Sequence, residues 1–88
     1  GYADRVRKKI KPLIIFNAEA VSGNPAVVVL LDLAPDGTIL KRTVVTASSD
    51  PAWDRAILLA IERAESLPRD ENGKIPMRQI KLTFKPKD

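Results

Sequence analysis

A strict alternation of apolar and polar residues near the C-terminus constrains the fold of this chain more than any other feature. The alternation runs from Gln79 to Pro86. In a β-strand this period of two puts Ile80, Leu82 and Phe84 on one face and polar residues on the other. We therefore expect a strand at residues 77–86 that belongs to a sheet and has one buried face.

Two further strands and a tight turn precede it. Residues 26–33 are nearly all apolar, which predicts a strand that is buried on both sides or lies in the sheet centre. A Pro-Asp-Gly turn at residues 35–37 predicts a hairpin, because proline presets the first turn position and glycine supplies a positive φ. Residues 39–47 form the second strand, and Lys41 and Arg42 make it less buried.

Two stretches have helical periodicity. Residues 2–11 combine one apolar stripe with five basic side chains, and we expect Pro12 to end this helix. Asp50 and Pro51 form a typical helix start for the main helix, which we expect to close at Leu67-Pro68. The apolar stripe of the main helix consists of Trp53, Ala56, Ile57, Ala60, Ile61 and Ala64.

The other segments are connections. Residues 13–16 are apolar, and their periodicity fits a helical turn, a short strand or an apolar lid. Residues 17–25 and 69–76 are polar and rich in turn-forming residues, which predicts loops.

The short hairpin sets the order of the strands. It leaves no room for a strand between the first two, so the third strand joins outside them and lies at an edge. Because the first strand is the most apolar, we expect the order second–first–third, with the main helix as the crossover. The expected fold class is α+β, a three-stranded antiparallel sheet with helices packed on one face (α-β-β-α-β), in a single domain spanning residues 1–88.

An edge strand suggests a function. Its unpaired N–H and C=O groups can accept a strand from another chain, with affinity from the backbone and specificity from nearby pockets. The candidate partner-binding residues are those of the third strand: Met77, Arg78, Gln79, Ile80, Lys81, Leu82, Thr83, Phe84 and Lys85.

Composition argues against catalysis and metal binding. The chain has no Cys and no His, which removes disulfides, thiolate nucleophiles, imidazole chemistry and the usual zinc sites. Helix capping explains Ser48, Ser49, Asp50 and Asp54 fully. Serine needs a base to become a nucleophile, and with no histidine in the chain a Ser–Lys pair is the catalytic alternative that the sequence leaves open. Asp32 and Asp36 lie in a strand and a turn rather than in a calcium loop. We expect no enzymatic activity, no cofactor and no metal site.

The formal net charge is +4 and the pI about 9.7. The basic first helix suits an acidic protein, a phosphate backbone or anionic lipid, but a solvated face explains it most simply. The few aromatic residues do not interleave with basic ones, so we expect a protein partner rather than nucleic acid. We also expect the domain to be a monomer and to make no direct contact with a membrane. No apolar run is long enough to span a membrane. Gly1 in place of an initiator Met indicates a piece of a longer protein.

Three blocks of sequence resemble the C-terminal domain of the TolA family, a relative of the TonB C-terminal domain. They are residues 33–40, residues 48–56 running on to Ala60-Ile61, and Leu67-Pro68 followed by residues 82–86. Tyr2 and the basic helix that follows favour TolA over TonB, whose domains more often open with a Tyr-Pro element.

The resemblance implies a function beyond what the residues indicate. TolA-like proteins have an inner-membrane helix, a long periplasmic linker and this terminal domain, and they belong to the Tol-Pal system that acts in cell-envelope constriction. The domain binds a peptide at the N-terminus of TolB, and colicins and filamentous phage coat proteins use it for entry. Some relatives carry a disulfide here, which this chain cannot form. The alternatives are a TonB-like energy-transducing domain that binds outer-membrane receptor peptides, or a small basic nucleic-acid-binding domain.

Overall fold

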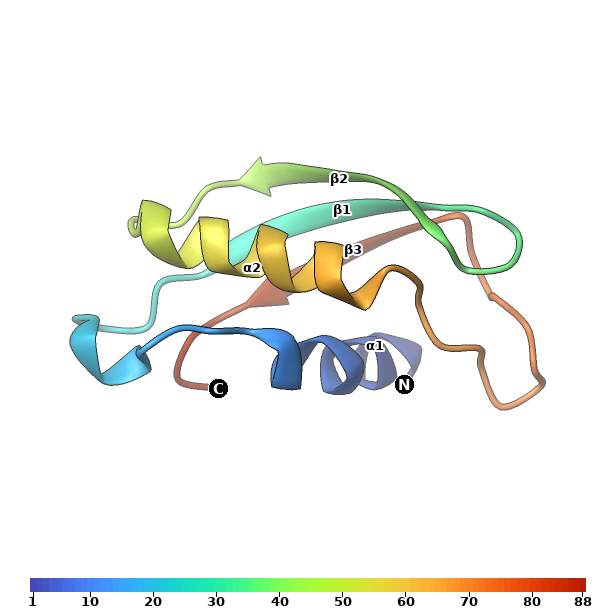
Figure 1. The fold of residues 1–88 in the computed structure, drawn as a ribbon, viewed down its shortest axis with the longest axis horizontal. Coiled ribbons are helices and arrows are strands. Elements are labelled where there is room, and N and C mark those ends of the chain that lie inside the picture. The colour runs from blue at the N-terminus through green and yellow to red at the C-terminus, as the bar shows by residue number, and fades with distance from the viewer.

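The computed structural model describes residues 1–88 and has two layers, a three-stranded antiparallel sheet and two helices on one of its faces (Figure 1). The elements in chain order are α1 (Tyr2–Ile10), β1 (Val27–Leu33), β2 (Ile39–Thr46), α2 (Pro51–Ala64) and β3 (Gln79–Phe84), with short 3₁₀ turns at Lys11–Leu13 and Ala18–Ala20. The strand order is β2-β1-β3, so the predicted fold class and strand order are confirmed.

The β1–β2 hairpin closes as its turn residues predict. The N–H of Ala34 donates to the carbonyl of Thr38 over 2.9 Å, and the carboxylate of Asp36 accepts the N–H of Thr38 over 3.0 Å. Gly37 has a φ of 94°, a left-handed conformation that glycine adopts without strain. The hairpin leaves no space between its strands, so β3 joins outside them, and it lies beside β1.

The core lies between the sheet and the helices. Alternate residues of β1 are buried and the intervening ones are half-buried, so β1 is the central strand but is not buried on both faces. The buried face of β3 consists of Ile80, Leu82 and Phe84, as its alternation predicts. All six residues of the predicted α2 stripe are buried against these strands. α1 reaches the same core through Val6 and Ile10.

The start of α2 matches its sequence and its end does not. The Asp50 carboxylate accepts the N–H groups of Ala52 and Trp53, as an N-cap should. The helix ends at Ala64, so the predicted end at Leu67-Pro68 is wrong. Glu65 adopts a φ of 64° in a γ-turn, in which the N–H of Ser66 donates to the carbonyl of Ala64 over 2.7 Å.

The end of α1 also differs from the prediction. Pro12 lies inside the 3₁₀ turn Lys11–Leu13, so the chain continues for one more turn beyond Ile10. Ile14 and Phe16 then pack against the core in an irregular segment, while Ile15 is exposed. The hydroxyl of Tyr2 donates to the carbonyl of Pro68 over 2.7 Å and fastens the start of α1 to the chain after α2. Neither helix is of a length and apolarity that would let it traverse a bilayer.

Candidate functional site

The peptide groups of β3 face alternately toward β1 and away from it. The N–H of Leu33 donates to the carbonyl of Arg78 over 2.8 Å, which fixes this pair as hydrogen-bonded. In an antiparallel ladder hydrogen-bonded and non-bonded pairs alternate, and the register continues without interruption to Phe84. The residues whose N–H and C=O groups point outward are therefore Gln79, Lys81 and Thr83.

No other part of the chain forms backbone hydrogen bonds with this edge. β3 has β1 as its one neighbour in the sheet, and no backbone hydrogen bond from a loop or helix end reaches the outward peptide groups. The side chains of Gln79, Lys81, Thr83 and Lys85 are exposed. The Gln79 amide donates to the carboxylate of Asp32 over 2.7 Å, toward β1 rather than outward. β3 is thus an open edge strand.

The opposite edge of the sheet is irregular. The register between β1 and β2 shifts twice, and each shift leaves one residue of β2 without a partner. These extra residues are Leu40 and Val45, which are 67% and 49% exposed. A bulge bends its strand and interrupts the row of pairing groups. β2 is therefore a poor template for another strand, whereas β3 has no bulge.

The core holds the open edge in place. Ile80, Leu82 and Phe84 are all buried, and Leu82 is only 1% exposed. The indole N–H of Trp53 donates to the carbonyl of Phe84 over 3.1 Å in a buried contact. Because Trp53 lies in the first turn of α2, this bond fixes the C-terminal end of β3 to the helix. The outward peptide groups are thus carried on a rigid frame.

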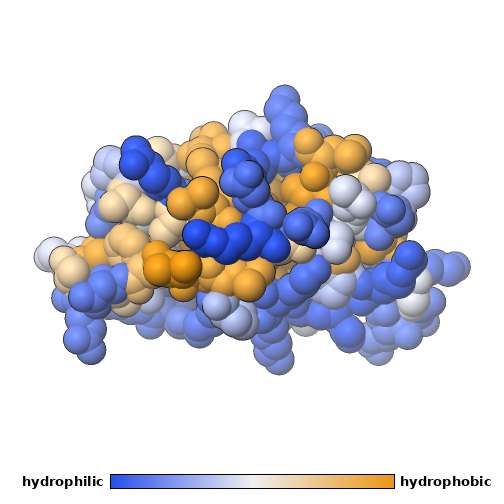
Figure 2. Space-filling view, viewed as in Figure 1, coloured by the Kyte–Doolittle hydropathy of each residue, from blue (hydrophilic) through white to orange (hydrophobic).

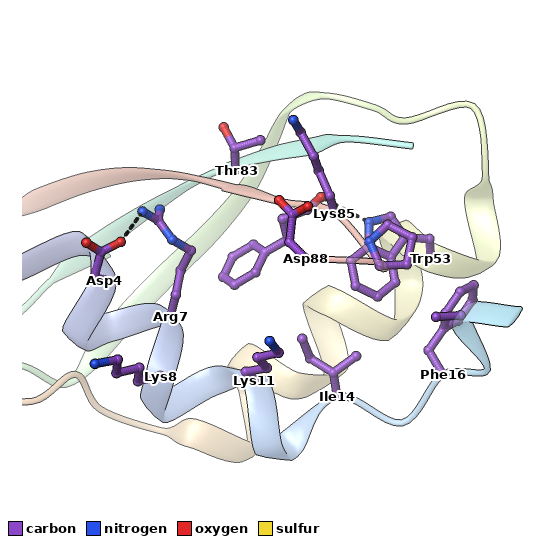
Figure 3. Close-up of a pocket in the computed structure, with 13 residues that line it drawn as sticks. Asp4, Arg7, Lys8, Lys11, Ile14, Phe16, Trp53, Thr83, Lys85 and Asp88 are labelled. Carbon is purple, nitrogen blue, oxygen red and sulfur yellow. Dashed lines mark hydrogen bonds and ion pairs between the residues drawn. The ribbon is translucent and has the colours of Figure 1, made fainter. Parts of the chain in front are cut away.

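A groove adjoins the C-terminal end of β3. It has a volume of about 780 Å³ and lies between α1, the segment that follows α1, and residues 83–88 (Figure 3). Its apolar lining includes Ile14, Phe16, Trp53 and Phe84, and the rings of Phe16 and Trp53 meet at a tilt with centroids 5.1 Å apart. We call it the basic groove because of its charged residues, which are Arg7, Lys8, Lys11, Lys85, Asp4 and Asp88.

The charges of the basic groove do not cancel. Arg7 pairs with Asp4 over 2.8 Å, and this hydrogen bond, with help from the amino terminus, lowers the pKa of Asp4. Lys8, Lys11 and Lys85 form no ion pair. The groove therefore combines uncompensated positive charge with an apolar lining.

The face of the molecule that carries both helices gives less indication of a binding site. On the side that carries both helices, apolar atoms show in patches separated by hydrophilic side chains (Figure 2).

The polar residues considered for catalysis serve the fold: the Ser48 hydroxyl donates to the Asp54 carboxylate over 2.5 Å, and Asp50 caps α2. Asp36 belongs to the hairpin turn, and no three acidic side chains gather as a metal site would require.

Sequence reasoning placed the edge strand but missed the basic groove. It assigned Trp53 to the core, which its 3% exposure confirms, and gave the basic face of α1 to solvent. The groove joins residues 4–18 to residues 83–88, segments far apart in the sequence. The apolar run at residues 13–16, directly after a basic helix, was the one local signal.

The sheet, its single regular edge and the two helices behind it define a small α+β domain of the kind that serves protein interaction. Residues 1–84 match the model of the TonB C-terminal family, and the chain belongs to that family. Domains of this family are periplasmic protein-interaction domains without enzymatic activity.

Solved structures share the fold. One similar structure is TolAIII bound to a peptide derived from the N-terminus of TolB, with a TM-score of 0.81 at 23% identity, covering 99% of this chain and 73% of that one. The TonB C-terminal domain of Helicobacter pylori has a TM-score of 0.59 at 17% identity, covering 96% and 76%. The HasB C-terminal domain has a TM-score of 0.55 at 21% identity, covering 97% and 66%. No curated protein sequence gives a significant match.

Proposed function

We propose that this domain is the peptide-docking domain of a Tol-Pal-type envelope system. An extended peptide from the N-terminus of TolB adds as a fourth strand beside β3, and residues 77–85 form the contact. The longer protein is anchored in the inner membrane, and this domain lies in the periplasm. Colicin translocation segments and filamentous phage coat proteins would compete for the same edge.

The open, regular edge of β3 carries this proposal. Gln79, Lys81 and Thr83 each offer one N–H and one C=O at the spacing of a β-ladder, and nothing in the chain occupies them. A partner strand gains affinity from these backbone groups whatever its side chains. The similarity in fold to TolAIII in complex with a TolB peptide supports this class of ligand.

A TonB-like role is the second candidate. The match to the TonB C-terminal family and the shared fold with two other C-terminal domains support it. The same edge would then receive a peptide from an outer-membrane receptor, so the two roles differ in the partner rather than in the mode of docking.

Heteronuclear NMR tests the proposal directly. We expect a cognate TolB N-terminal peptide, added at physiological salt, to shift the amide signals of residues 77–85 and to give cross-strand contacts with them. Shifts for a receptor peptide alone would support the TonB-like role. Binding of an oligonucleotide that collapses steeply with added salt would instead identify a nucleic-acid-binding domain. No amide shifts along β3 with any peptide would refute docking at this edge.

A proline variant sharpens the test. Because the N–H of Lys81 points outward, Lys81→Pro keeps every hydrogen bond within the sheet while removing one donor and blocking close approach of a partner. We expect peptide affinity to fall on the order of tenfold or more.

The other edge supplies the matched control. Arg42 lies opposite Leu31, which uses its peptide groups to bond β3, so the N–H of Arg42 points outward from β2. Arg42→Pro should therefore leave peptide affinity unchanged. If it weakens binding as much as Lys81→Pro does in a correctly folded protein, the docking edge is not β3.

A further inference from the structure

The basic groove is continuous with the open edge. Thr83 and Phe84, the last two residues of β3, line the groove, and so does Lys85, which directly follows the strand. Figure 3 shows Thr83 and Lys85 beside the groove. A strand that pairs with the outward groups of Lys81 and Thr83 and continues past them is led into this groove. The groove is therefore placed to contact the side chains at one end of a docked peptide.

The charges select the chemistry of those side chains. Lys8, Lys11 and Lys85 lack ion-pair partners. Of the two carboxylates in the groove, Asp4 is engaged by Arg7, and Asp88 accepts the side-chain amide of Asn24 over 3.1 Å. A second copy of this chain is a poor occupant, because pairing two β3 strands would bring their lysines together. An acidic segment complements the site.

The apolar lining of the groove adds a second requirement. Trp53 and Phe84 are almost fully buried, whereas Ile14 and Phe16 are half-buried and more accessible. A site with apolar walls and a few positive groups binds an apolar side chain while its charged rim fixes a neighbouring anion. A carboxylate next to an apolar residue satisfies both parts of the groove.

We propose that the basic groove is a specificity site that takes an acidic side chain and an adjacent apolar side chain of the docked peptide, just beyond the residues that pair with β3. This proposal rests on the peptide-docking function above. In this division of roles the backbone of β3 supplies affinity for any extended chain, and the groove selects acidic ones.

The test uses a cognate TolB N-terminal peptide and the same peptide with every Asp and Glu replaced by Asn and Gln. The dissociation constants come from NMR titration, with the indole signal of Trp53 as a reporter inside the groove. We expect the amide version to bind about fivefold more weakly. Lys11→Glu should weaken the native peptide by a similar factor and abolish its advantage over the amide version.

Lys41→Glu is the control, because it changes net charge equally on the strand at the opposite edge. It should preserve the difference between the two peptides. Equal affinities of the two peptides for the unchanged domain, with β3 amides shifting in both, would overturn the groove proposal while leaving strand addition standing. If Lys11→Glu and Lys41→Glu had equal effects, the positive net charge of the domain would explain the attraction of an acidic peptide, and the groove would not be a specificity site. If neither peptide shifts β3, docking itself fails and the groove proposal fails with it.

Discussion

Gly37 is the position at which a single methyl group should most damage this fold. It has a φ of 94°, and a Cβ there would lie 2.8 Å from Cδ1 of Ile75 and 2.9 Å from the carbonyl oxygen of Leu67. The Ile75 methyl can rotate away, but the Leu67 oxygen belongs to the backbone. The N–H of Leu67 also donates to the carbonyl of Gly37 over 2.8 Å, so these two segments of the chain are held close together. Gly37→Ala must force them apart.

Two contributions set the loss of folding stability expected for Gly37→Ala. Holding alanine in the left-handed region costs about 1–2 kcal/mol, and the overlap with a fixed backbone adds about 1–3 kcal/mol. In a domain of this size 1 kcal/mol shifts the melting temperature by roughly 4–8 °C. We therefore expect Gly37→Ala to lower the melting temperature by at least about 8 °C.

Gly73→Ala separates the two contributions. Gly73 has a φ of 74°, but a Cβ there would meet nothing within 4 Å. This variant should therefore lose only the conformational part, about 1–2 kcal/mol. Thermal unfolding followed by circular dichroism measures both variants. Equal losses at Gly37 and Gly73 would refute the argument, because the close contact would then contribute nothing.

Three other predictions concern contacts around the core. Trp53→Phe removes the indole donor to the buried Phe84 carbonyl and should lower the free energy of unfolding by about 1–3 kcal/mol; chemical denaturation followed by circular dichroism measures it, and an unchanged midpoint would contradict it. Glu65→Gly relieves a positive φ and should raise the melting temperature, so a lower value would show that the γ-turn is unstrained. Burial, with a smaller contribution from the charge of Asp70, raises the pKa of Tyr2 above 10.0. The unfolded chain then loses this proton first, and stability should fall as the pH rises above about 10. Tyr2→Phe should lack that part of the fall in pH-dependent unfolding; identical pH dependence of the two proteins would show that Tyr2 does not contribute.

Structural features that depend on residues close together in the sequence were predictable. The stripe from Trp53 to Ala64 and the Asp50 cap define α2, because both depend on residues within a few positions of one another. The strand order followed from one short turn and the relative apolarity of two strands. The alternation in β3 identified its buried face, and the edge position followed from the hairpin.

Features that depend on tertiary contacts were not predictable. α2 ends at Ala64 although no glycine or proline stands there, because Glu65 adopts a positive φ while its carbonyl accepts the N–H of Ile39. Nothing in the sequence of β2 marks Leu40 and Val45 as bulge residues. The basic groove needs α1 to lie beside β3, a placement set by Val6 and Ile10 entering the core rather than by any local pattern.

The two bulges in β2 also limit how far such a sheet can grow. A sheet with two regular edges is bivalent, and each added strand leaves a new end on which an open ribbon can lengthen. In this molecule only the edge formed by β3 is regular, so the proposed strand addition could occur at one edge only. Two copies that met through β3 would bury both regular edges and stop at a closed pair. The bulges at Leu40 and Val45 thereby prevent repeated strand pairing at the β2 edge and so oppose assembly into fibres.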